Sequence, residues 1–183
     1  MGYAVGAAVT LGLVMTIGDF AWAALALPHR VAYGVTHGAV MCLCLGLAIG
    51  VRARRPAPAG VAGPAIGVLA AATFYALAPA LRWSAMFPAW MLLWILFAVL
   101  QEWLDRKEGM PAALGRGAAA ALLSGAAFYL VSGIWTADSH HRPNLAIHFA
   151  SWSAAFLPGF LALFTRRPRP ALHRARERAD VNA

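Results

Sequence analysis

Residues 31–51 read VAYGVTHGAVMCLCLGLAIGV, a run without Asp, Glu, Lys or Arg that stops at the basic cluster RARR, residues 52–55. An α-helix needs about 20 apolar residues to cross the hydrocarbon core of a bilayer. This run has that length and almost no polar side chains, so it predicts a membrane-spanning helix that ends at Arg52.

The rest of the chain repeats this pattern. The sequence has 183 residues, of which 61% are hydrophobic and 12% charged, whereas a soluble domain is about 45–50% apolar and about 25% charged. Short polar or turn-forming stretches separate five more apolar segments: 3–27, 61–81, 85–104, 111–136 and 145–165. Segments of about ten alternating residues, which a membrane barrel requires, do not occur. We therefore predict an all-α, polytopic integral membrane protein: a bundle of six transmembrane helices in three antiparallel hairpins.

The basic residues predict the orientation. They cluster after the second, fourth and sixth segments: Arg52, Arg54 and Arg55; Arg106, Lys107 and Arg116; and six arginines between 166 and 178. Cytoplasmic loops are enriched in Lys and Arg, so both termini are expected in the cytoplasm. Residues 1–165 would form one transmembrane domain and 166–183 a flexible basic tail. Orientation accounts for the basic residues, so the expected partner is the lipid bilayer and not nucleic acid.

Small residues recur every four positions in the second segment, at Gly34, Gly38, Cys42, Gly46 and Gly50. This spacing aligns small side chains on one helix face and lets another helix approach closely. The stripe therefore predicts a packing seam. The same face, through Gly34, Gly38, Gly46 and Gly50, is also a candidate surface for oligomerisation.

Two polar residues lie at matching depths in the first two segments. Asp19 lies eight residues from the outer end of its segment and His37 six residues from the outer end of the next, which is about 12 and 9 Å at 1.5 Å per residue. An ionisable side chain inside a membrane segment is costly and normally faces the bundle interior or a water-filled cavity. We therefore predict that this hairpin brings the carboxylate and the imidazole together.

More histidines and tryptophans gather towards the same outer side. Asn144 is expected to cap the sixth helix, which places His148 on its first turn and Trp152 one turn deeper. We predict a polar pocket open to the outer side, floored by Asp19 and His37. The expected ligand-binding residues are Asp19, Trp22, His37, Trp135, His148 and Trp152. The candidate catalytic residues are Asp19, His37 and His148. The candidate metal ligands are His37, His140, His141 and His148.

No phosphate-binding loop, Cys-x-x-Cys pair, His-Glu-x-x-His helix or Gly-x-Ser-x-Gly elbow occurs in the sequence. Aromatic walls around a few polar groups are typical of small-molecule sites, so the first hypothesis is a protein that binds or transports a small amphipathic or lipid-like molecule. The alternative is a membrane-embedded enzyme that uses a His/Asp acid–base or metal site. A lesser alternative is a haem protein with His37 and His148 as axial ligands. No cofactor follows from the sequence.

Overall fold

The computed structural model describes residues 1–25, 29–136 and 144–165, without the side chains at positions 30, 83 and 132–136. The described residues form six helices that are long and apolar enough to cross a membrane, and they contain no strand. The predicted all-α bundle of an integral membrane protein is thus confirmed. The helices are α1 (Gly2–Leu25), α2 (Arg30–Arg52), α3 (Pro56–Leu81), α4 (Met86–Asp105), α5 (Met110–Thr136) and α6 (Leu145–Phe164), with the short 3₁₀ helix η1 (Arg82–Ala85) before α4.

One helix boundary differs clearly from the prediction. The Pro/Ala/Gly composition of residues 56–60 predicts a loop before the apolar segment 61–81, but α3 already begins at Pro56. Proline is favoured in the first helical turn, because the N–H that it lacks would have no helical partner there. The proline that looked like a loop signal is a helix-start signal instead. At the other predicted start, the Asn144 side chain accepts hydrogen bonds from the backbone N–H groups of Ala146 and Ile147, at 3.0 and 3.2 Å, and caps α6 as expected.

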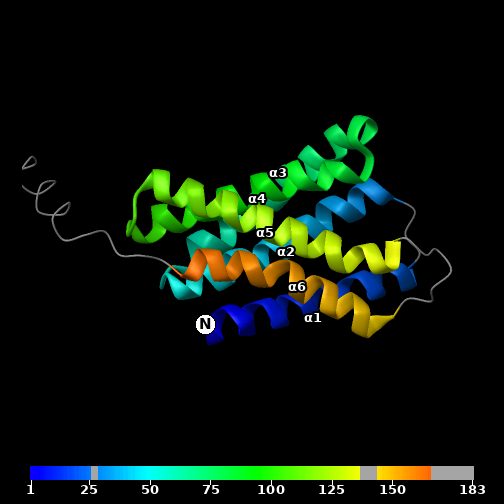
Figure 1. Ribbon diagram of the computed structural model, residues 1–183, viewed down its shortest axis with the longest axis horizontal. Coiled ribbons are helices and arrows are strands. Elements are labelled where there is room, and N and C mark those ends of the chain that lie inside the picture. The colour runs from blue at the N-terminus through cyan, green and yellow to red at the C-terminus, as the bar shows by residue number, and fades with distance from the viewer. Residues whose placement is uncertain (26–28, 137–143, 166–183) are drawn as a thin grey trace, which may run out of the picture.

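The six helices run roughly along the long axis of the molecule (Figure 1), and their contacts arrange them in a ring. Around the ring the order is α1, α6, α5, α4, α3 and α2, and each of these neighbouring pairs is in extensive contact. The ring closes between α2 and α1, where contacts are few. The first of the three expected hairpins is therefore loosely packed, because α1 lies mainly along α6 and α2 mainly along α3.

The small-residue stripe of α2 forms the predicted seam, with α3 as its partner. A Cβ atom at Gly38 would lie 3.0 Å from the carbonyl oxygen of Gly67, and one at Gly46 would overlap the carbonyl oxygen of Ala59. Gly63 and Gly67 of α3 approach the α2 backbone equally closely. The seam is thus intramolecular, and oligomerisation through the glycine face of α2 would require α3 to leave it.

The core of the ring is aromatic. Trp94, Phe97, Phe156 and Phe160 are fully buried. A side chain at Gly159 would overlap the ring of Trp94, so this glycine lets α6 approach α4. The wide aromatic side chains fill the centre of the ring and pack α4 against α6, which are separated in the ring order only by α5.

A polar cluster ties α4, α5 and α6 at the end of the bundle where α1 begins, called here the N-terminal end. The four-residue spacing of Glu102 and Arg106 predicts an exposed ion pair on the helix surface. Glu102 is instead 5% exposed and accepts hydrogen bonds from the backbone N–H groups of Glu108 and Gly109. This prediction was wrong, because Arg106 ends the helix in a left-handed conformation. Arg116 binds Glu108 at 2.6 Å and donates to the carbonyl oxygen of Leu163 at 3.1 Å.

Candidate functional site

The side chain of Asp19 lies at the centre of a polar cluster in the half of the bundle remote from the N-terminal end. Its Oδ1 atom lies 3.0 Å from Nδ1 of His37, and its Oδ2 atom lies 2.7 Å from Nε2 of His148. The Nε1–H group of Trp152 donates to Oδ2 at 2.9 Å, and the hydroxyl of Tyr33 donates to Oδ1. One carboxylate therefore joins α1 to both α2 and α6, and we call these five residues the Asp19 cluster.

Helix geometry explains why these side chains meet. The matched depth of Asp19 and His37, computed from the helix rise alone, corresponds to a direct contact in the structure. Tyr33 was not selected as a site residue, although it precedes His37 by four positions and so faces the same way. The same spacing places His148 and Trp152 on one face of α6. In each pair, the i,i+4 spacing brings two side chains to the same carboxylate oxygen of Asp19.

Aromatic rings enclose the cluster. The ring of Trp22 packs on Tyr33 with centroids 4.7 Å apart, and the ring of Phe20 meets His148 edge-on at 5.6 Å. Trp152 packs against His37 at 5.5 Å. The side chains of Asp19 and the two histidines are only 14–17% exposed. The rings hold the donors in place and limit the access of lipid and water to the carboxylate.

Several predicted site residues cannot be placed. The backbone of Trp135 belongs to α5, but its side chain lies outside the described residues, and so do His140 and His141. Where the structure describes side chains, no group of three or more His, Cys, Asp or Glu residues is arranged to hold a metal ion. His37 and His148 contact the two oxygens of one carboxylate, His37 through Nδ1 and His148 through Nε2, so each uses one of its two ring nitrogens for this contact.

The chemistry available to the cluster follows from its hydrogen bonds. Four donors satisfy the carboxylate of Asp19, which offsets the cost of burying a charge away from water. The cluster thus ties three helices together, and both carboxylate oxygens already have protein partners.

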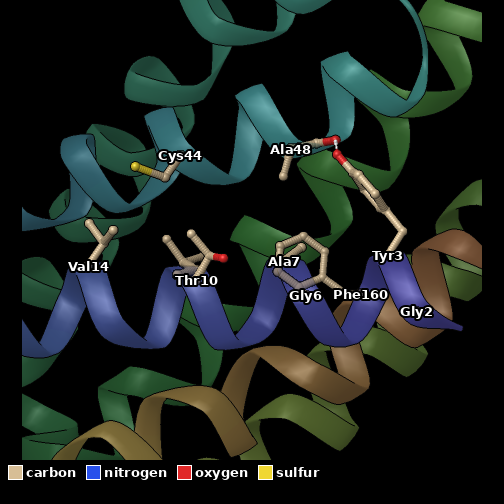
Figure 2. Close-up of a pocket in the computed structure, with 10 residues that line it drawn as sticks. Gly2, Tyr3, Gly6, Ala7, Thr10, Val14, Cys44, Ala48 and Phe160 are labelled. Carbon is tan, nitrogen blue, oxygen red and sulfur yellow. Dashed lines mark hydrogen bonds between the residues drawn. The ribbon is translucent and has the colours of Figure 1, made fainter.

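A second feature lies between the same two helices, nearer the N-terminal end. A cavity of about 600 Å³ follows α1 and α2 where they diverge (Figure 2). Buried Leu11 and Phe160 belong to its lining, while Tyr3 and Val14, also in the lining, are 42% and 37% exposed. The complete lining is Gly2, Tyr3, Gly6, Ala7, Thr10, Leu11, Val14, Cys44, Ala48 and Phe160. We call this feature the α1–α2 groove.

The groove exists because α1 and α2 are held together chiefly at its two ends. At the N-terminal end the hydroxyl of Tyr3 donates to the carbonyl oxygen of Ala48 at 2.6 Å, and beyond the far end lies the Asp19 cluster. Between these ties the α1 face carries the small residues Gly6 and Ala7, which leave the space unfilled (Figure 2). Neither Asp19 nor His37 lines this groove. The pocket expected over these two residues on the outer side stays a prediction.

Comparisons with protein-family models, with curated proteins and with solved structures gave no match. The function is therefore argued from the two features between α1 and α2.

Proposed function

We propose that this membrane protein binds a lipid-like molecule, whose apolar chain lies in the α1–α2 groove. The observation that supports this most directly is the groove itself, an elongated and largely apolar hollow on the side of a membrane bundle. Its volume of about 600 Å³ falls within the range of about 300–1,000 Å³ that is usual for small-molecule sites. A chain could enter sideways from the bilayer, because part of the lining is exposed.

The dimensions of the groove match one leaflet. Gly2 and Val14 lie at opposite ends of the α1 lining, and twelve residues of α-helix rise about 18 Å. Half of the hydrocarbon core is about 15 Å thick. With both termini in the cytoplasm, as the basic clusters favour, the groove would lie in the cytoplasmic leaflet.

The Asp19 cluster would serve this function as a clamp. It fixes α1 to α2 and α6 beyond the groove, so that the two groove-forming helices diverge from a fixed point.

The alternative of an acid–base enzyme has the contact between Asp19 and His37 in its favour. It is the weaker proposal, since a substrate in the groove would not touch either residue. An acid–base pair must come within hydrogen-bond reach of the proton that it transfers.

The test uses a phosphatidylcholine with a photoactivatable diazirine in its acyl chain. The purified full-length protein is reconstituted with this lipid, illuminated, and analysed for crosslinked peptides. We expect crosslinks on α1 and α2 around Thr10 and Cys44 that exceed those on the lipid-facing side of α5. N-ethylmaleimide provides a second measurement: bound lipid should slow its reaction with Cys44, while Cys42, fully buried, serves as an internal reference.

A matched pair of glycine variants makes this test specific. A Cβ atom would meet nothing within 4 Å at either Gly6 or Gly115, so leucine fits at both positions, but only Gly6 lines the groove. Gly6→Leu should lower the groove crosslinks several-fold and leave the melting temperature unchanged, whereas Gly115→Leu should alter neither. Equal crosslinking of the groove and α5, or equal yields from Gly6→Leu and wild type, would refute lipid binding in the groove.

A further inference from the structure

We infer that the occupant of the α1–α2 groove is a lipid with an anionic headgroup, which Arg52 binds at the N-terminal mouth of the groove. This inference rests on the proposed function and adds the chemical class of the ligand. It follows from how the α2 side of the groove continues past its last lining residue.

The α2 side of the groove is a stripe of residues spaced by four. Cys44 and Ala48 line the groove, and the next position of the stripe is Arg52, in the last turn of α2. Residues four apart lie on the same face of a helix. Arg52 is exposed, so its guanidinium is available at the point where the apolar lining ends.

The α1 side places a polar group at the same mouth. The hydroxyl of Tyr3 reaches across to the carbonyl oxygen of Ala48, and Arg52 follows Ala48 by four residues, about one helical turn. Arginine binds phosphate with several N–H donors in a planar fork. The groove is therefore apolar along its length and cationic at its mouth, which is the complement of an anionic phospholipid and not of a neutral one.

The position of this mouth in the bilayer agrees with that assignment. Arg52 ends a spanning helix, where the hydrocarbon core gives way to headgroups. An acyl chain in the groove, about 18 Å long from Gly2 to Val14 by helix rise, would bring its own headgroup to this level. A fatty acid or a phospholipid would present its charge here, and the shared chemistry is an anion attached to a long apolar chain.

The experiment compares two diazirine lipids with identical acyl chains, phosphatidylglycerol and phosphatidylcholine, on the reconstituted full-length protein. Wild type should crosslink the anionic lipid in the groove about fivefold more efficiently at equal concentration, since one basic residue near the surface contributes about 1 kcal/mol towards an anionic lipid. Arg52→Gln should abolish that preference, and Arg52→Lys should keep most of it. Arg54→Gln is the matched control, because it removes the same charge two residues further on, off the stripe, and should leave the preference unchanged.

Each outcome has a distinct meaning. If both lipids crosslink equally in wild type while Gly6→Leu still suppresses them, the groove binds lipid but the headgroup inference is overturned. If Arg52→Gln and Arg54→Gln lower the preference equally, the charge acts through the general surface potential and Arg52 is not the ligand. If neither lipid is enriched in the groove, the proposed function itself fails. Oleate, added as a competitor, distinguishes a fatty-acid carboxylate from a phospholipid headgroup as the bound anion. If oleate competes with phosphatidylglycerol, the site also accepts a carboxylate. If oleate does not compete, the site is restricted to phospholipids.

Discussion

The Asp19 cluster predicts a coupled loss of stability when its members are replaced. Asp19→Asn keeps the shape of the side chain but replaces one acceptor by a donor. The Nε1–H group of Trp152 can only donate, so the remaining amide oxygen should turn towards it. The new NH₂ group then faces Tyr33 and His37, both of which can accept a hydrogen bond.

The expected loss of stability follows from the hydrogen bonds that no longer involve a charged carboxylate. Hydrogen bonds to a charged group contribute about 1.5–3 kcal/mol, and neutral ones about 1 kcal/mol. Two histidine contacts to Asp19 are weakened, so Asp19→Asn should lower the free energy of unfolding by about 1–4 kcal/mol. His37→Gln removes one of these contacts and should cost about 1.5–3 kcal/mol. Because the two residues touch, the double variant should cost about 1–2 kcal/mol less than the sum of the single costs.

The measurement is a double-mutant cycle on the purified protein, unfolded in mixed micelles with increasing denaturing detergent and followed by tryptophan fluorescence. Asp19→Asn combined with Glu102→Gln is the control cycle, since Glu102 lies near the opposite end of the bundle and the two effects should add within about 0.5 kcal/mol. Additive costs in the cycle of Asp19 and His37 would refute the contact, and with it the description of the cluster as a clamp between α1 and α2.

Two further predictions concern the seam and the topology. Gly38→Leu should lower the melting temperature in detergent, because its side chain would meet the α3 backbone at Gly67 and overpacking costs about 1–3 kcal/mol. Gly115→Leu, the control, should not lower it. Equal melting temperatures for the two variants would argue against the seam. A reporter fused after Ala183 should lie in the cytoplasm and one inserted at Ser139 outside, as the positive-inside rule requires; the same side for both would contradict six crossings.

Hydropathy was sufficient to predict the fold class. The absence of water in the bilayer core forces each spanning segment to satisfy its own backbone hydrogen bonds, so an apolar run of sufficient length specifies a helix without reference to its neighbours. The four-residue spacing of glycines likewise predicted the close approach at α2, since that spacing describes one helix face. The depths of Asp19 and His37 could be computed because the rise of a helix is constant.

The sequence could not specify how each helix is rotated or which helix is its neighbour. The ring order, in which α1 packs on α6 and leaves α2 largely alone, depends on the fit of surfaces such as Gly12 against Ser153 and Gly159 against Trp94. Hydrophobicity does not distinguish these surfaces, because all of them are apolar. That order brings His148 and Trp152 to Asp19 and creates the groove where α1 and α2 diverge. The side chains of the Asp19 cluster and of the α1–α2 groove are visible in the sequence, but their assembly depends on packing between segments that are distant in the sequence.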